Sequence, residues 1–191
     1  MKKLTLLLLF LFAFQSQAQE KVKEGEIDFE IKNDTVNVKK TKDYLMDELL
    51  FGNRKEVLNF SLVNENGVLF LHFQAIETNS VFIPTKCFDK KSKIFIQLQN
   101  GKIVTLISTS DTCSQLYIDP DTNFNTQLLS NYFLFSKANF EDLKQSPISM
   151  IRVNFGAEYR DYVPKKTLVS ELNNLEYSPE NYFINNIKSA F

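Results

Sequence analysis

The one histidine of this chain is the residue best suited to acid–base chemistry. His72 lies in a segment of alternating polarity, on the face opposite Leu71 and Phe73. In the hairpin that this spacing predicts, Ser61 stands directly across from it, within reach of its ring. A serine nucleophile activated by a histidine also needs an orienting acid and oxyanion donors, and no motif supplies them. We therefore expect a histidine on the polar face of a sheet, and we predict no catalytic residues.

A second candidate is a calcium loop. Asp119, Asp121 and Asn123 occupy its first three alternate positions. The pattern then fails, because Phe124 stands where glycine is needed and Ser130 where the bidentate glutamate should be. A zinc site lacks ligands in a chain with one histidine and two cysteines that we expect to be paired. We predict an Asp-Pro turn here, no metal site and no cofactor.

Other charged residues give no defined site. Glu26, Asp28 and Glu30 share one strand face, which we expect to face solvent, with a cation-binding or inter-protein edge as the alternative. There is no glycine-rich phosphate loop, nucleophile elbow or zinc-binding helix. Two lysine clusters, at 39–42 and 86–93, are diluted by acids. We therefore predict no nucleic-acid partner.

Cys87 and Cys113 are the only cysteines, and we predict that they form a disulfide. The segment between them has the pattern of a hairpin that turns at Asn100-Gly101, a strong two-residue turn signal. With a two-residue loop, the cysteines come within one residue of register. Closing a loop of roughly 25 residues would stabilise the fold by about 3 kcal/mol. The alternative is a redox pair, but the spacing is not that of a CxxC motif. This register pairs Leu98 with Ile103, Ile96 with Thr105 and Ile94 with Ile107.

A second hairpin is predicted over 56–76, turning at Asn66-Gly67. Its register places Phe60 opposite Phe73 and Leu62 opposite Leu71, so that the large apolar side chains share one face.

The remaining segments complete the expected fold. Apolar spacing predicts helices over 42–51 and 167–175, a weak helix over 136–145, and a last helix that starts at Ser178-Pro179 with Phe183, Ile187 and Phe191 on one face. Strands are expected over 24–32, 35–38, 131–136, 148–155 and 158–163. This order predicts an α+β fold, an antiparallel sheet or sandwich built from hairpins with helices at the C-terminus.

The first 18 residues have the pattern of a secretory signal peptide. Lys2 and Lys3 precede an apolar run over 4–14, and Ser16 and Ala18 fit the −3 and −1 positions of a cleavage site. The run is too short to span a bilayer, and no later segment is long enough. We predict cleavage before Gln19, one exported domain over 19–191, and a periplasmic or extracellular location.

Composition fits an ordinary folded domain. The 191 residues carry 22 basic and 23 acidic side chains and are 43% hydrophobic, so neither disorder nor a strong electrostatic field is expected. The order of a cysteine, a strand, an Asn-Gly turn, a strand, a second cysteine and then residues 147–153 before a late helix resembles uncharacterised small secreted bacterial proteins, over about residues 84–191. That resemblance implies one exported domain and no function.

These observations favour a non-enzymatic binding or interaction domain. The expected partner is another protein, an envelope component or a small apolar ligand, and sheet faces and edge strands would supply the contacts. The alternatives are a structural subunit of an envelope complex, which a large exposed apolar patch would favour, and a small hydrolase with a carboxylate or serine site, which a cleft with converging acids would favour.

Overall fold

The computed structural model describes residues 20–135, 140–156 and 158–191. The predicted signal peptide, residues 1–18, and the expected new N-terminus at Gln19 lie outside these ranges. Among the helices of the described ranges, none is long and apolar enough to cross a membrane.

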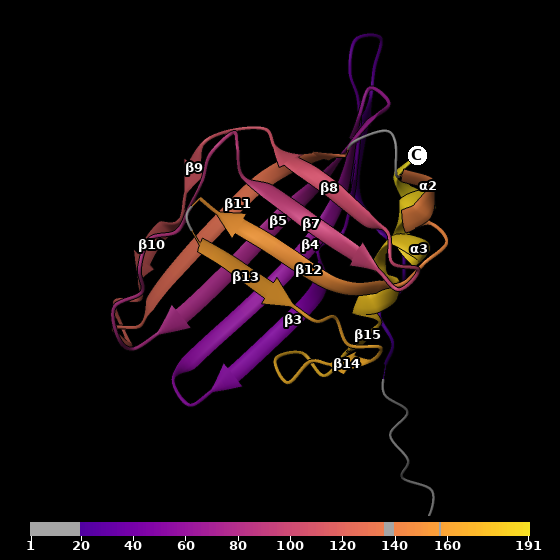
Figure 1. The fold of residues 1–191 in the computed structure, drawn as a ribbon. Coiled ribbons are helices and arrows are strands. Elements are labelled where there is room, and N and C mark those ends of the chain that lie inside the picture. Colours follow the sequence, from indigo (N-terminus) through magenta and orange to yellow (C-terminus); the bar gives the residue numbers. More distant parts are fainter. Residues whose placement is uncertain (1–19, 136–139, 157) are drawn as a thin grey trace, which may run out of the picture.

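The described residues form mostly antiparallel β-sheet, with a few short helices near the C-terminus. The main sheet has the order β1-β2-β4-β5-β11-β8-β7-β12-β13; β3 pairs with β4, and β10 pairs with β11. Figure 1 shows the sheet curling, so that β7, β8, β12 and β13 lie in front of β3, β4 and β5. The strands of the main sheet are β1 (Ile27–Lys32), β2 (Asn37–Thr41), β3 (Tyr44–Phe51), β4 (Arg54–Glu65), β5 (Val68–Asn79), β7 (Lys93–Leu98), β8 (Ile103–Ser108), β10 (Gln115–Ile118), β11 (Asn125–Phe135), β12 (Ile148–Phe155) and β13 (Glu158–Tyr162).

Short elements complete the chain. Strands β6 (Cys87–Phe88) and β9 (Thr112–Cys113) pair with each other, as do β14 (Leu168–Val169) and β15 (Glu176–Tyr177). The helices are α2 (Phe140–Leu143), η3 (Pro179–Asn181), α3 (Tyr182–Asn186) and η4 (Ile187–Ala190).

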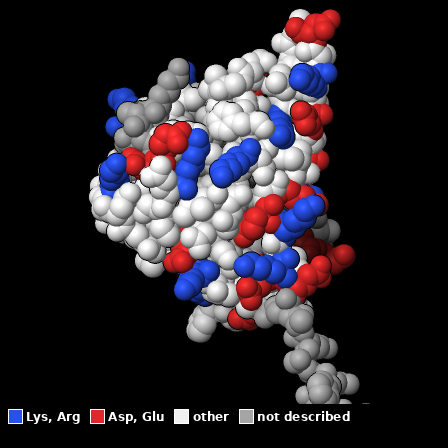
Figure 2. Space-filling view, turned by 90° about the vertical axis from the view of Figure 1, so that its right-hand side faces the viewer, with Lys and Arg blue, Asp and Glu red and all other residues white. Residues whose placement is uncertain are grey.

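The core lies between the two layers of the curled sheet. Phe73 of β5 has its ring centroid 6.3 Å from that of Phe155 of β12, so it reaches the opposite layer, and 5.4 Å from that of Phe88 of β6. The C-terminal helices close one end of this core: Tyr182 packs 5.8 Å from Phe60, and Phe183 packs 5.9 Å from Phe135. Figure 2 shows the face around these helices, on which acidic and basic side chains are intermixed.

The hairpin over 56–76 has the predicted register. Phe60 lies opposite Phe73 and Leu62 opposite Leu71, and all four side chains are fully buried. Asn66 and Gly67 both have positive φ, as the two-residue turn requires.

The hairpin formed by β7 and β8 differs from its prediction by one residue. Its loop contains three residues rather than two, because the N–H of Leu98 donates to the carbonyl of Lys102. Ile96 therefore lies opposite Val104, not Thr105, and Ile94 lies opposite Leu106, not Ile107. Val104 and Leu106 are consequently buried, whereas Ile103 and Ile107 are exposed on the other face.

The corrected register brings the cysteines into direct opposition. Cys87 pairs with Cys113 across β6 and β9, and the two sulfur atoms are bonded. The predicted disulfide is therefore present in the structure.

Two predicted helices are wrong. Residues 44–51 form strand β3 against β4, with a bulge between Leu45 and Asp47. Within 167–175, Leu168 belongs to β14 and Leu172 is exposed in the following turn. The α+β label therefore fits only loosely, because the helical part of the described chain is limited to α2 and the elements after Pro179.

Of the other predicted helices, residues 136–139 lie outside the described ranges, and α2 forms over 140–143. The last helix begins as predicted after Ser178. Phe183 and Ile187 are buried on it, but Phe191 is half exposed.

Candidate functional site

A narrow cavity opens at the end of the core opposite the C-terminal helices. On β4, Phe60 reaches Tyr182 at the helical end, while Glu56 and Leu58 line the cavity. On β11, Phe135 lies at the helical end, while Gln127 lines the cavity. The space open to water molecules is about 30 Å³, enough for about two of them. We call this opening and its surroundings the mouth of the sheet.

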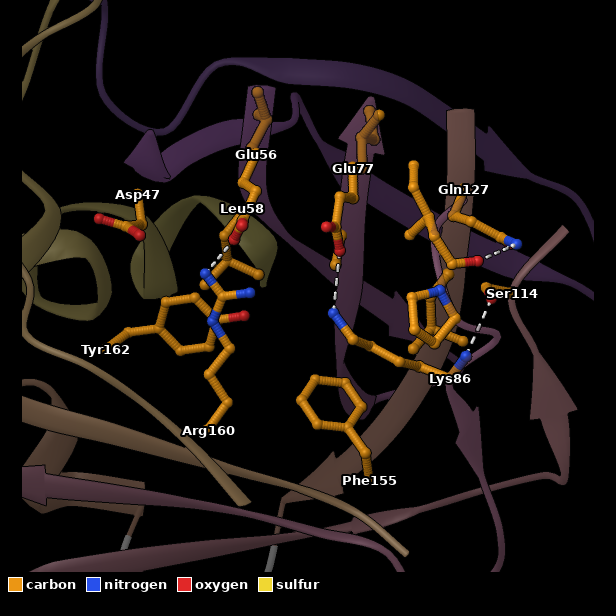
Figure 3. A pocket seen from close by; sticks show the side chains of 16 residues that line it. Asp47, Glu56, Leu58, Glu77, Lys86, Ser114, Gln127, Phe155, Arg160 and Tyr162 are labelled. Carbon is orange, nitrogen blue, oxygen red and sulfur yellow. Dashed lines mark hydrogen bonds and ion pairs between the residues drawn. The ribbon is translucent and has the colours of Figure 1, made fainter. Parts of the chain in front are cut away.

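Ion pairs connect the two layers across the mouth. Arg160 of β13 pairs with Glu56 of β4, and Lys86 Nζ lies 3.0 Å from an oxygen of Glu77 of β5 (Figure 3). Arg54 also pairs with Glu56, whose residue exposure is only 6%. Each of these cations therefore already faces a carboxylate.

Asp47 differs from the other two acids of the mouth. Among the described residues, its carboxyl forms no ion pair within 4.0 Å. The charges of Arg160 and Lys165 act on it from a longer distance. Burial raises the pKa of its carboxyl, while the charges of Arg160 and Lys165 oppose that rise. Burial likewise raises the pKa of Tyr162, whose ring lies 4.8 Å beneath the Arg160 guanidinium.

Gln127 presents a buried acceptor without a partner. Its Nε2 donates to the carbonyl of Ile83 at 3.4 Å, which fixes the orientation of the amide. The opposite atom, Oε1, is fully buried and accepts no hydrogen bond from any residue of the described ranges. The residue as a whole is 6% exposed. A buried carbonyl oxygen left without a donor costs about 1–3 kcal/mol of folding free energy.

Exposed apolar side chains surround the mouth. Leu49 lies directly opposite Glu56, and Leu116 directly opposite Gln127, so both are on the same sheet face as these cavity residues. They are 44% and 50% exposed. We call the rim the set Leu49, Phe51, Phe82, Leu116 and Ile118, of which Phe51 and Phe82 are 80% and 78% exposed.

His72 lies where the sequence predicts, on the polar face of the second hairpin. Its Nδ1 is 3.0 Å from Ser61 Oγ and its Nε2 is 2.8 Å from Ser130 Oγ. Asp43 approaches Nδ1 at 3.8 Å, and the nearby side chains of His72, Ser61 and Lys40 hold the pKa of the Asp43 carboxyl well below its usual range. Tyr132 stacks on the imidazole. Ser61 is fully buried and cannot meet a substrate, so the predicted pair is brought together as a buried network rather than as an open site.

The calcium pattern forms a turn. Asp119 Oδ1 accepts the backbone N–H of Asp121 at 2.9 Å, and the N–H of Asn123 donates to the carbonyl of Asp119. The Asp119 carboxylate thus already accepts a backbone hydrogen bond within the turn. Across the described ranges, no three His, Cys, Asp or Glu side chains are grouped so that they could hold a metal ion.

Two of the three acids predicted to share a face near β1 form ion pairs. Glu26 lies 2.9 Å from Lys42, and Asp28 lies 3.1 Å from Lys40. The negative charges of these two acids are therefore neutralised by two lysines of the cluster at 39–42.

Eight separate segments of the chain supply the residues of the mouth, so local sequence patterns do not bring them together. One signal was available. Glu56 is in phase with Leu58 and Phe60, and Glu77 is in phase with Phe73 and Ala75, so each strand carries a charge on its apolar face near one end. A charge in that phase indicates either an ion pair across the core or a polar opening into it.

We expect the Asp47→Asn variant to be more stable than the natural chain near neutral pH. The folded-state pKa of Asp47 lies above its unfolded value, so its charged form is disfavoured in the fold at every pH above the folded pKa. Removing the charge removes that cost. Below the unfolded pKa of about 3.9 both states are protonated, and the gain should vanish. Thermal unfolding followed at neutral and at acidic pH measures this, with Asp121→Asn at the exposed turn as the control.

An Asp47→Asn variant that melted lower than the natural chain near neutral pH would show that the carboxylate stabilises the fold. Asp47 would then be a structural residue of the mouth.

No family model matches this chain, and no curated protein matches it. Among solved structures, it is similar to the crystal structure of an uncharacterised β-sandwich protein from Clostridium difficile 630. The two share 16% sequence identity over 78% of this chain and 99% of the other, with a TM-score of 0.25.

Proposed function

We propose that this chain is an exported binding domain that holds a small ligand with an apolar body at the mouth of the curled sheet. The observation that carries the proposal is a cavity that opens between the two layers of the sheet, lined by Asp47, Glu56 and Glu77 and bordered by the exposed apolar side chains of the rim. A position needed only for packing would be filled more stably by an apolar side chain, and polar residues retained at such a cost are typical of binding sites.

The proposal includes export. The lysine pair and apolar run before Gln19 support cleavage of residues 1–18 and one exported domain over 19–191. The disulfide between Cys87 and Cys113 suits the oxidising conditions of a periplasm or the cell exterior.

Native mass spectrometry of protein from an exporting host tests both parts. We expect the mass of residues 19–191 less two hydrogen atoms, together with additional mass that is lost on denaturation. In a Phe51→Ser, Phe82→Ser double variant we expect at least about a tenfold loss of retained ligand, the equivalent of about 1.4 kcal/mol. Both side chains are largely exposed, so the fold should be retained.

A matched control replaces two exposed apolar residues far from the mouth, Ile31→Ser and Val36→Ser. If both double variants retained the same ligand mass, binding at the mouth would be rejected.

A second candidate, a structural subunit of an envelope complex, is supported by the outer face of the sheet. Phe70 lies opposite both Val63 and Leu134, and Leu134 lies opposite Ile107, so an apolar row crosses four strands. Leu134 and Ile107 are 39% and 44% exposed. Val63 is buried and Phe70 is partly exposed, so Leu134 and Ile107 form the exposed part of this row. Exposed apolar side chains that adjoin one another are typical of contact surfaces. The same native spectrum separates the candidates, because a subunit would be recovered as a multimer or a complex.

A further inference from the structure

A serine, a histidine and an acid meet on the outer face of the sheet, away from the mouth. Strands β4, β5 and β11 are neighbours there and carry Ser61, His72 and Ser130. His72 Nε2 lies 2.8 Å from Ser130 Oγ, within the range of about 2.6–3.2 Å in which a base can activate a nucleophile. Ser130 is partly exposed, whereas Ser61 is fully buried, so of these two serines only Ser130 can meet a substrate.

The second nitrogen of the ring fixes the order of the protons. The Asp43 carboxylate lies 3.8 Å from His72 Nδ1, and its negative charge favours a proton on that nitrogen. The Nδ1–H then donates to Ser61 Oγ at 3.0 Å. Nε2 is left with its lone pair, so the hydroxyl of Ser130 donates to it. This is the arrangement in which a histidine can remove the proton of a serine nucleophile.

A free amide stands beside the same serine. Gln74 of β5 lies directly opposite Ser130, and the Cβ atoms of such cross-strand pairs are about 4.5–5.5 Å apart. Its Oε1 accepts a hydrogen bond from Asn59 Nδ2 at 3.4 Å. Its Nε2 forms no hydrogen bond with any residue of the described ranges. A side-chain amide of this kind can donate to an oxyanion that forms next to the serine.

The surroundings of Ser130 are apolar. Side chains alternate along β11, so Leu128, Tyr132 and Leu134 share its face. They are 36%, 43% and 39% exposed. A substrate that presents its carbonyl carbon to Ser130 can therefore lay an apolar chain on these side chains, which favours an acyl group without charge.

We propose that Ser130 is the nucleophile of an esterase site on the outer face of the sheet, with His72 as its base, Gln74 as its oxyanion donor and an ester of an apolar acyl chain as its substrate. Ser130 Oγ attacks the carbonyl carbon, and its proton passes to His72 Nε2. The ester C–O bond then breaks, and the leaving alkoxide takes that proton. Water attacks the acyl-serine in the same way, which releases the carboxylic acid and restores Ser130. Asp43 is a positioning residue that acts through His72.

Covalent labelling tests the nucleophile. Near neutral pH, an alkyl fluorophosphonate should react at Ser130, whose oxygen displaces fluoride from phosphorus, and peptide mass spectrometry should locate one adduct there. Ser130→Ala should carry none. Ser149→Ala is the matched control, because Ser149 is a partly exposed strand serine whose Oγ donates only to the carbonyl of Gln97. The control should be labelled like the natural chain.

Turnover tests the base, the oxyanion donor and the substrate class. We expect kcat/KM for p-nitrophenyl hexanoate to exceed that for the acetate at least about tenfold, because four more CH₂ groups lie on the apolar face. His72→Gln keeps a polar side chain and should lower kcat/KM about 10²-fold or more. Gln74→Leu should lower kcat about 10²–10³-fold.

The positioning role of Asp43 has a spectroscopic signature. Nitrogen chemical shifts of the imidazole, measured by nuclear magnetic resonance, should place the proton on Nδ1 in the natural chain. Asp43→Asn keeps the shape of the side chain but removes its charge. The variant should therefore populate both neutral forms of the ring and lower kcat/KM, which an acid that only supports the fold would not do.

Three results would overturn the proposal. The first is a natural chain that is not labelled at Ser130, or is labelled equally in His72→Gln. The second is hydrolysis of the hexanoate ester at the same rate by the natural chain and by Ser130→Ala purified in the same way. The third is a proton on Nε2 of His72 in the natural chain. The mouth uses none of these residues, so ligand binding there stands or falls by its own experiment.

Discussion

Replacing Phe73 by alanine should lower the free energy of unfolding by about 3–5 kcal/mol, the usual range for a large aromatic side chain removed from a packed core. Phe73 is fully buried, and its ring contacts those of Phe60, Phe88 and Phe133 at centroid distances of 6.0, 5.4 and 6.1 Å. These neighbours come from three different strands, β4, β6 and β11, so the space left by the ring cannot be filled by movement of one strand alone.

Urea unfolding at equilibrium measures this loss. Phe51→Ala is a matched control, because Phe51 is 80% exposed and should cost less than about 0.5 kcal/mol. A loss below about 1 kcal/mol for Phe73→Ala would mean that the two layers do not pack around this ring.

Removing the disulfide should be the second large effect. The Cys87→Ser, Cys113→Ser double variant should lose about 3 kcal/mol, because the natural bond closes a loop between residues 26 positions apart and restricts the unfolded chain. Since the pair lies in the two-stranded β6–β9 sheet rather than in the main sheet, we expect the variant still to fold.

Thermal unfolding of both forms, with and without a reducing agent, tests this expectation. The reductant should lower the melting temperature of the natural chain toward that of the double variant and leave the variant unchanged. Equal melting temperatures for all four samples would contradict a stabilising disulfide.

Local sequence predicts a hairpin well where the turn signal and the alternation agree. In the 56–76 segment, the Asn-Gly turn and the apolar phase support the same register, and the structure has it. In the 93–108 segment an Asn-Gly pair is also present, but Gln99 joins the loop. The apolar residues there do not distinguish the two registers, because Ile103, Val104, Leu106 and Ile107 supply apolar side chains on both faces.

The two wrong helices have different causes. In β3 a bulge after Leu45 shifts the alternation of buried and exposed side chains, so that Tyr44, Leu45 and Met46 are all buried. Without the regular alternation of a strand, this segment has apolar residues that also fit one face of a helix. In 167–175 the leucines repeat at helical spacing, but Ser170 Oγ accepts the N–H of Leu172 and forms a local turn. Neither the bulge nor the turn has a strong sequence signal.

The mouth could not be predicted from local sequence patterns, because its residues are far apart in the chain. Arg160 and Glu56 are paired although 104 positions separate them, and Gln127 donates to the carbonyl of Ile83 across 44 positions. The sequence contains such residues but not their juxtaposition, which depends on how the sheet curls.

The position of the C-terminal helices has a consequence for the order of folding. Tyr182, Phe183 and Ile187 are fully or almost fully buried, and they fill the end of a core whose walls, β4 and β11, come much earlier in the chain. A nascent chain that still lacks these residues exposes Phe60 and Phe135 and cannot complete its core. Contacts of such long sequence separation also slow the folding of a finished chain. We therefore expect the chain to remain unfolded until residues 182–187 have emerged, which suits an export route that threads unfolded chains through a membrane channel.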